Sequence, residues 1–212
     1  MRRNGENLMH DLFASDVRFT PIPMDDADIS YLKRLPMPDS DQAIFERLHR
    51  ETVWLHEEVL VWGKKHFQPR LTAWYGDPGK SYRYSGTVMH PLPWTNLLLS
   101  LRRELEALTD ARFNSVLLNL YRDQNDRMGF HSDDEPSLGL EPTIASLSYG
   151  ATRTLIFKHK KLKEIGRKRI PLTSGSLLLM RGPTQKNWVH GIDRESIPCG
   201  PRINLTFRNI IK

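Results

Sequence analysis

The chain has 212 residues, one cysteine and a formal net charge of +6. This length is enough for one domain with a substantial core, and a single cysteine excludes an internal disulfide and a zinc site built from several cysteines. A sequence pI near 9.5 favours a polyanionic partner such as nucleic acid over an acidic or neutral class of binding protein.

Residues 1–38 are polar and contain four prolines, and we expect them to form an irregular arm before one domain of residues 39–212. Ser40 can cap a helix over residues 41–48, in which apolar side chains recur at helical spacing. A second amphipathic helix is predicted over residues 94–108, where leucines form one stripe. Both helices are expected to pack against a sheet.

From Ser115 onward, short apolar runs alternate with turn residues, which is typical of strands. No helix-length segment separates these runs, so a parallel α/β architecture is disfavoured. The sequence therefore predicts a mainly β protein with flanking helices, whose core is a double-stranded β-helix, or jelly roll, of two packed sheets. The predicted strands are residues 116–121, 143–149, 153–157, 176–180 and 202–207.

Three residues could share one metal ion. Side chains at i and i+2 of a strand point the same way, so His131 and Asp133 would present an imidazole and a carboxylate together, and His190 would complete the set. Two imidazoles and one carboxylate leave coordination positions open, as in non-haem Fe(II) oxygenases. The short pair alone is not specific, because an aspartate can cap a turn while a histidine bonds to nearby backbone.

The last predicted strand has one apolar face and one polar face, and the polar face has two cations and no carboxylate. Arginines at its two ends could bind both ends of a small dicarboxylate, and Asn119 and Tyr121 on another strand could add hydrogen bonds. A solvated outer strand is the alternative interpretation. The polar face consists of Arg202, Asn204, Thr206 and Arg208.

At these residues the chain, from about Val61 to Arg208, resembles the AlkB family of Fe(II)- and 2-oxoglutarate-dependent dioxygenases, and it is most like the animal homologues that repair duplex DNA. The resemblance implies Fe(II) bound by His131, Asp133 and His190, with 2-oxoglutarate and O₂ as co-substrates. It implies a 2-oxoglutarate site of Arg202, Arg208, Asn119 and Tyr121, supported by Asn204 and Thr206. The motifs are Asn119-x-Tyr121, His131-x-Asp133-Asp134-Glu135, His190 and Pro201-Arg202-Ile203-Asn204-Leu205-Thr206-Phe207-Arg208.

The resemblance also implies an activity. The family oxidises N-alkyl groups on damaged bases, such as 1-methyladenine and 3-methylcytosine in DNA, coupled to decarboxylation of 2-oxoglutarate, and it releases formaldehyde and succinate. A methyl group on the pairing edge of a base lies inside a duplex. The enzyme must therefore extrude the nucleotide or act on single strands.

By the same resemblance, a nucleotide-recognition segment covers about residues 55–90. Trp62 falls where the homologues carry an aromatic finger that fills the gap left by an extruded base. A buried tryptophan in a hairpin, and tyrosines that cover the core, are the structural alternatives. The residues that match the base pocket of the homologues are Arg70, Tyr82, Tyr84 and Glu135.

The strongest charge run is residues 158–169, with seven basic residues and one acidic residue between two strand-like segments. We interpret it as a basic hairpin that contacts the nucleic-acid backbone, although such runs can also be solvated loops. The sequence departs from the duplex-repair homologues in residues 191–195, where those enzymes have a basic cluster and this chain has Asp193 and Glu195. This departure puts contact with the opposite strand in doubt.

Three other functions are kept as alternatives. The first is the same chemistry directed at RNA, the second is a hydrolase with catalytic zinc in the same triad, and the third is a non-catalytic nucleic-acid binding module. The zinc hydrolase leaves the two arginines without a role. We expect a monomer without membrane contact inside the cell, in the cytoplasm of a bacterium or the nucleus of a eukaryote.

Overall fold

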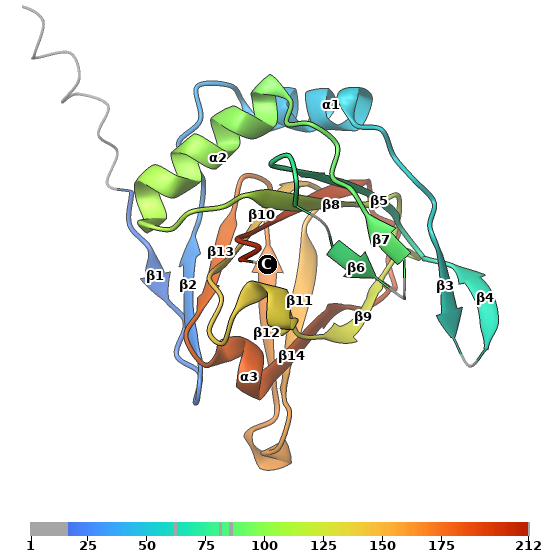
Figure 1. The fold of residues 1–212 in the computed structure, drawn as a ribbon. Coiled ribbons are helices and arrows are strands. Elements are labelled where there is room, and N and C mark those ends of the chain that lie inside the picture. Colours follow the sequence, from blue (N-terminus) through green and yellow to red (C-terminus); the bar gives the residue numbers. More distant parts are fainter. Residues whose placement is uncertain (1–16, 62, 81, 85–86, 212) are drawn as a thin grey trace, which may run out of the picture.

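The computed structural model describes residues 17–61, 63–80, 82–84 and 87–211, which form two stacked antiparallel sheets with helices over one of them (Figure 1). The larger sheet has the order β1 (Thr20–Pro21), β2 (Asp28–Leu32), β13 (Leu177–Arg181), β10 (Ile144–Gly150), β15 (Arg202–Arg208), β8 (Ser115–Tyr121) and β5 (Leu71–Gly76). The smaller sheet has the order β12 (Arg167–Leu172), β11 (Arg153–His159), β14 (Trp188–Ile192) and β9 (Met128–His131). This arrangement confirms the predicted jelly roll.

Two small hairpins and several helices complete the described part of the fold. One hairpin, of β3 (Glu58–Val61) and β4 (Lys64–Phe67), projects to one side of the two sheets in Figure 1. The other, of β6 (Tyr82–Tyr84) and β7 (Thr87–Met89), lies in front of the sheets in that view. The helices are α1 (Asp41–Glu51), α2 (Asn96–Thr109), α3 (Thr184–Asn187) and the 3₁₀ turns η1 (Pro136–Leu138) and η2 (Lys163–Ile165). None of the helices in these residues combines the length and the apolar character needed to cross a membrane.

Helix α1 begins after Ser40 as the sequence predicted, and α2 begins at Asn96, two residues after the predicted start. The Ser40 hydroxyl accepts a hydrogen bond from the Ala43 amide at 3.2 Å, and Thr95 caps α2 in the same way through the Leu98 amide. Such caps satisfy amides that have no partner within the first turn. The apolar stripes of α1 and α2 cover the outer face of the larger sheet (Figure 1) and form one hydrophobic core with it.

Strand β15 separates this core from the interior between the sheets. Its apolar residues Ile203, Leu205 and Phe207 face the helices and are fully buried. Its alternate residues face the smaller sheet, and Arg202 is only 1% exposed. The polar face of β15 is therefore buried, which excludes the alternative of a solvated outer strand. Buried polar groups need partners or a ligand, so this face is a candidate site.

The prediction of an irregular arm was wrong for residues 20–32. Strand β2 pairs with β13 along its whole length, from Asp28 opposite Arg181 to Leu32 opposite Leu177. The prolines that suggested irregularity lie in the short edge strand β1 or outside β2, where no backbone N–H is needed for the ladder. The sheet therefore begins before the expected domain boundary at residue 39.

The packing of α2 yields a stability prediction. Leu101 is fully buried, whereas Leu99 on the same helix is 36% exposed. Leu101→Ala should lower the free energy of unfolding by about 2–5 kcal/mol, because it leaves a cavity in the core, whereas Leu99→Ala should change it by less than about 1 kcal/mol. Denaturant unfolding of both variants measures this difference. Equal losses would contradict the described orientation of the helix.

Candidate active site

Strand register brings the two histidines together. His131 ends β9, His190 lies in the middle of β14, and the two are directly opposite in the antiparallel pair. Their ring centroids are 4.5 Å apart. Close approach of the strands depends on Gly191, because a Cβ at this position would lie 2.9 Å from the Met128 carbonyl oxygen. A small residue after His190 thus allows the pairing that aligns the imidazoles.

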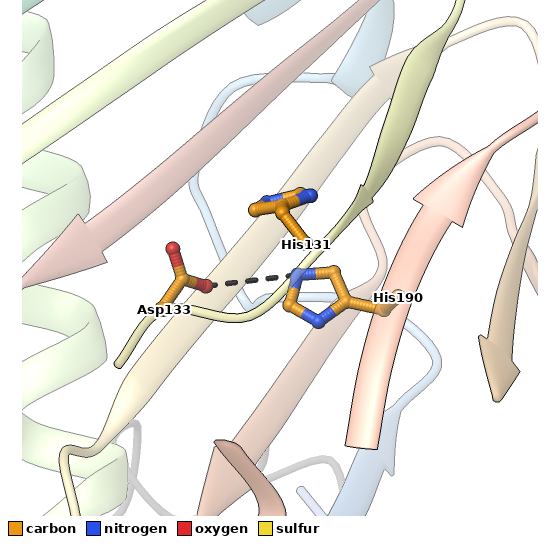
Figure 2. Close-up of side chains that lie close together, drawn as sticks. All are labelled: His131, Asp133 and His190. Atoms are coloured by element: carbon orange, nitrogen blue, oxygen red, sulfur yellow. Dashed lines mark ion pairs between the residues drawn. The ribbon is translucent and has the colours of Figure 1, made fainter. Parts of the chain in front are cut away.

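Asp133 joins the histidines from a loop. Strand β9 ends at His131, so the prediction that His131 and Asp133 share one strand was wrong, although the three side chains do converge (Figure 2). The Asp133 amide donates to Gln185 Oε1 at 2.9 Å, and this bond with α3 fixes the turn after β9. The potential ligand atoms of the triad lie within 4.8 Å of one another, close enough to surround one ion.

The histidines present suitable ring atoms. His131 Nδ1 lies 3.0 Å from the Gly129 carbonyl oxygen. Because a carbonyl can only accept, Nδ1 carries the proton and Nε2 keeps its lone pair for a metal. His190 Nε2 lies 3.6 Å from Asp133 Oδ2, and its Nδ1 has no partner among the described residues.

Burial and neighbouring charges set the protonation states of the triad. Burial, together with the adjacent His131, lowers the pKa of His190 to about 3, so its imidazole is neutral at pH 7. Burial alone would raise the pKa of Asp133, but Arg208 and the two histidines outweigh it and lower that pKa to about 2. His190 is therefore a neutral imidazole and Asp133 a carboxylate, which are the states that a divalent metal requires of these ligands.

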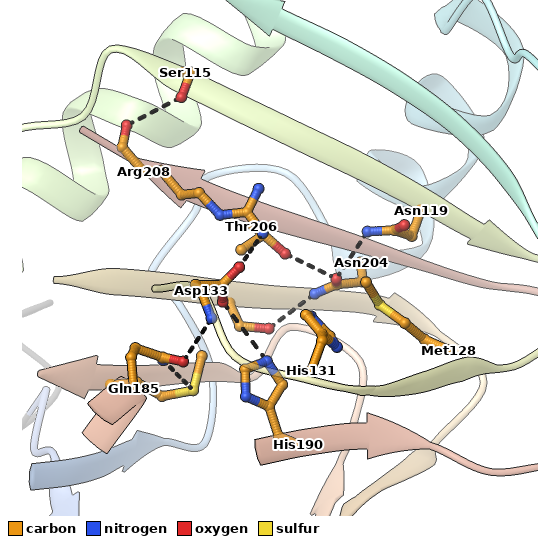
Figure 3. A network of polar contacts seen from close by, with 12 residues as sticks. Ser115, Asn119, Met128, His131, Asp133, Gln185, His190, Asn204, Thr206 and Arg208 are labelled. Carbon is orange, nitrogen blue, oxygen red and sulfur yellow. Dashed lines mark hydrogen bonds and ion pairs between the residues drawn. The ribbon is translucent and has the colours of Figure 1, made fainter. Parts of the chain in front are cut away.

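Arg208 holds the carboxylate in place. Its guanidinium forms an ion pair and hydrogen bond with Asp133 Oδ1 (Figure 3), and Asp133 is only 2% exposed. A buried carboxylate without a counter-charge would be strongly destabilising. Arg208, which was predicted to bind the dicarboxylate, thus also contacts Asp133 of the candidate metal site.

The polar face of β15 continues as a hydrogen-bonded row (Figure 3). Asn119 Nδ2 and the Thr206 hydroxyl both donate to Asn204 Oδ1, at 3.4 and 3.1 Å. Asn204 Nδ2 donates to the Ser146 hydroxyl at 2.8 Å. These bonds fix Asn204 and Thr206 on the face of β15 that also carries Arg202 and Arg208.

Arg202 is the strongest candidate for an anion-binding group. Its guanidinium lies over the Tyr121 ring, 5.2 Å from the centroid, and donates to the Ser148 hydroxyl at 2.9 Å. Its Nε and Nη1 are buried and have no hydrogen-bond partner among the described residues. Burial lowers the pKa of Arg202, but an arginine stays protonated at neutral pH. A carboxylate of a ligand would satisfy this cation.

A cavity of about 420 Å³ opens beside the triad. His131, Asp133 and Arg208 line it, together with the predicted base-pocket residues Arg70 and Glu135. The Arg70 side chain is held in position by a hydrogen bond, in which its Nε donates to Asn119 Oδ1 at 2.7 Å. The structure thus brings part of the predicted substrate site next to the candidate metal site.

Other predicted residues are placed only in part. Tyr82 and Tyr84 lie in β6, whose backbone alone is described, and Trp62 lies outside the described residues. The basic run forms the end of β11, η2 and the start of β12. Within it, Lys158 Nζ lies 3.3 Å from the centroid of Phe130, which lines the cavity.

Sequence reasoning missed several residues that support the site. Gln185 bonds to the Asp133 amide, Ser148 bonds to Arg202, and Met128 Sδ accepts from the Tyr121 hydroxyl at 3.8 Å. No motif marks these residues, because each reaches the site through strand pairing or through the short helix α3. Only the antiparallel register of β10 with β15, which places Ser148 opposite Asn204, could have suggested Ser148.

The sequence of residues 28–208 matches the family model described as 2OG-Fe(II) oxygenase superfamily. The chain belongs to this superfamily. Its members use Fe(II) and 2-oxoglutarate, and the residues present fit both groups. The triad offers two imidazoles and a carboxylate around one point, and Arg202 offers a buried guanidinium with unpaired nitrogens.

Curated relatives confirm the resemblance to AlkB homologues. Alpha-ketoglutarate-dependent dioxygenase alkB homolog 3 of Bos taurus is 44% identical over 176 residues, which are 79% of this chain and 61% of the relative. DNA oxidative demethylase ALKBH2 of Homo sapiens is 38% identical over 193 residues, which are 87% of this chain and 74% of the relative. The chain thus spans about three fifths of the length of the bovine relative.

A solved structure described as "The structure of OsALKBH1" has a TM-score of 0.62 with 17% identity, and the match covers 91% of this chain and 100% of that one. At this identity the likeness shows the fold. It agrees with the superfamily match in placing the jelly roll across almost all the described residues.

The geometry of the triad predicts selective loss of metal binding. Asp133→Ala should weaken Fe(II) affinity by at least about 100-fold, since even residues that only orient ligands cost 10- to 100-fold when removed, and it should abolish 2-oxoglutarate turnover. Anaerobic calorimetric titration with Fe(II) measures the affinity.

Asp134→Ala is the matched control. Its carboxylate is exposed and pairs with Lys160 at 2.9 Å, so Fe(II) affinity should stay within about twofold of that of the unmodified chain, because surface pairs contribute little. Equal metal affinity in the Asp133 and Asp134 variants would rule out Asp133 as a ligand.

Proposed function

We propose that this chain is an Fe(II)- and 2-oxoglutarate-dependent dioxygenase that removes alkyl groups from N-alkylated bases in DNA, such as 1-methyladenine and 3-methylcytosine. The observation that carries the proposal is the convergent triad beside a cavity lined by Glu135 and Arg70. The buried Arg202, which has unpaired nitrogens, lies on the same face of β15 as Arg208, which contacts Asp133. A zinc hydrolase would leave Arg202 buried without a ligand. The names of the relatives support the same activity.

The bound iron and 2-oxoglutarate would supply the oxidation of the alkyl C–H bond by O₂, with succinate and CO₂ as co-products. The chain's residues bind and orient the reactants. Arg202 receives one carboxylate of 2-oxoglutarate, and Tyr121 and Asn119 border it. Arg208 keeps Asp133 ionised and in position. The hydroxymethylated base then releases formaldehyde, which restores the original base.

The cavity positions the base beside the triad. Glu135 provides a carboxylate for the base and Arg70 a guanidinium fixed by Asn119. Asp133 and His190 are only 2% and 6% exposed, and this burial strengthens electrostatic interactions at the triad. Tyr82, Tyr84 and Trp62 keep the roles that the resemblance implies, the tyrosines in the base pocket and Trp62 as the finger.

The basic hairpin would bind the phosphate backbone. Residues 158–169 include seven basic residues, and Lys158 lies next to Phe130 at the cavity wall. Phosphates of the strand that carries the lesion could therefore lie beside the hairpin while the base enters the cavity. This proposal places the enzyme inside the cell, where its nucleic-acid substrate is, and a monomer is sufficient for it.

Product analysis tests the proposal. Oligonucleotides that contain 1-methyladenine or 3-methylcytosine, as duplex DNA, single-stranded DNA and RNA, are incubated with the chain, Fe(II), O₂ and 2-oxoglutarate. We expect mass spectrometry to show loss of the methyl group from DNA, with one succinate and one formaldehyde per repaired base. The Asp133→Ala variant is the control without activity.

Two outcomes would change the proposal. Demethylation of RNA without demethylation of DNA would assign the same chemistry to RNA. Lesion binding without succinate release would establish a non-catalytic binding module and contradict the enzymatic proposal.

A further inference from the structure

Glu57 is a carboxylate in the cavity that no family motif includes. It lies just before β3, in a segment that runs along the edge strand β5. Leu55 and Thr72 exchange two backbone hydrogen bonds of 2.8 and 2.9 Å. The backbone N–H of Gln68 donates to the backbone carbonyl oxygen of Glu57 at 2.8 Å. These bonds fix the backbone on both sides of Glu57, so its side chain starts from a defined position.

Two neutral groups hold the carboxylate itself. The Thr72 hydroxyl donates to Oε2 at 2.7 Å, and Gln68 Nε2 donates to the same oxygen at 3.4 Å. Thr72 and Gln68 are 2% and 3% exposed, so the donors are rigidly packed. Both hydrogen bonds use one oxygen, and Oε1 accepts no hydrogen bond from the described residues.

Glu57 has no counter-charge within the described part of the chain. No lysine, arginine or histidine of the described residues forms an ion pair with it, in contrast to Asp133, which pairs with Arg208. The neighbouring Glu58 also has a partner, Lys65 Nζ at 3.2 Å. A fixed, half-buried carboxylate with an unused oxygen is suited to bind a cation or a hydrogen-bond donor of a ligand.

Glu57 borders the same cavity as His131 and Glu135. Gln68 also lines this cavity, and its buried Oε1 has no partner among the described residues. The side of the cavity formed by the segment before β3 and by Gln68 thus offers two unused acceptors. Acceptors and negative charge at a cavity wall favour a ligand with N–H groups and positive charge.

We propose that Glu57 is a second substrate carboxylate, which makes the pocket select N-alkylated bases that carry a positive charge. This inference rests on the proposed function. Methylation at N1 of adenine or N3 of cytosine adds a substituent to a nitrogen lone pair and produces a cation with an adjacent exocyclic amine. Methylation at N3 of thymine replaces an N–H and leaves the base neutral, without that amine.

The two substrate classes therefore differ in what Glu57 can contact. A cationic base offers charge and an N–H to Oε1, whereas 3-methylthymine presents carbonyl oxygens that a carboxylate repels. Glu57 would favour the first class both by attraction and by exclusion of the second, the two routes by which binding sites achieve specificity.

Glu57→Gln tests the proposal, because the amide oxygen can still accept the bonds from Thr72 and Gln68 while the charge is lost. Binding of single-stranded oligonucleotides with one 1-methyladenine or one 3-methylthymine is measured by fluorescence anisotropy on the full chain without iron. We expect the affinity for 1-methyladenine to fall about tenfold, the range for loss of a charged hydrogen bond, and that for 3-methylthymine to stay equal or rise.

Turnover with Fe(II) and 2-oxoglutarate gives a second readout. In the variant, KM for 1-methyladenine should rise about tenfold while 2-oxoglutarate affinity is unchanged. Glu58→Gln is the matched control, since Glu58 pairs with Lys65 and does not line the cavity. It should leave both affinities unchanged.

The outcomes separate this inference from the proposed function. If Glu57→Gln weakens the binding of both lesions equally, Glu57 has a structural role only. An unchanged preference for the cationic base would also overturn the inference. In both cases demethylation by the unmodified chain would still support the proposed function. If the unmodified chain neither prefers lesions to normal bases nor demethylates them, the proposed function fails and the inference with it.

Discussion

The buried carboxylate of Asp133 is the group on which the described site depends. It faces two imidazoles in the interior of a jelly roll, where an isolated charge would be strongly unfavourable. Arg208, the last residue of β15, compensates that charge, and Gln185 fixes the backbone that carries it. The same arginine belongs to the polar face that continues to Arg202. The side chain of Arg208 therefore links the candidate metal site to the candidate anion site.

The alternation of apolar and polar residues in β15 explains how the fold can be stable with a buried polar face. Its apolar residues pack under α1 and α2 and form a core that does not involve the site. A second apolar cluster, which includes Phe157, Ile170 and Trp188, joins the two sheets, and its members Leu138 and Ile210 also line the cavity. The polar layer between the two clusters can therefore hold charged and polar groups with atoms that are available to bind ligands. Stability comes from the two clusters, and the chemistry is concentrated in the polar layer.

The sequence predicted the elements whose periodicity reflects burial. The helix after Ser40 follows from its cap, the second long helix from its leucine stripe, and strands β8, β10, β11, β13 and β15 from apolar runs. The alternation of β15 pointed to its polar face. The sequence did not predict β2, because the surrounding prolines suggested an irregular arm. Nor did it place Asp133 in a loop, since the i, i+2 spacing also fits a strand. Gln185 and Glu57 act through contacts between distant segments, which local patterns do not reveal.

The most direct test of the account is the visible spectrum of the metal-free chain under anaerobic conditions, after addition of Fe(II) and then 2-oxoglutarate. If the triad binds iron with open positions and Arg202 orients the keto acid beside it, a charge-transfer band should appear only when both are present. Absence of the band, together with catalytic activity restored by zinc, would contradict the account.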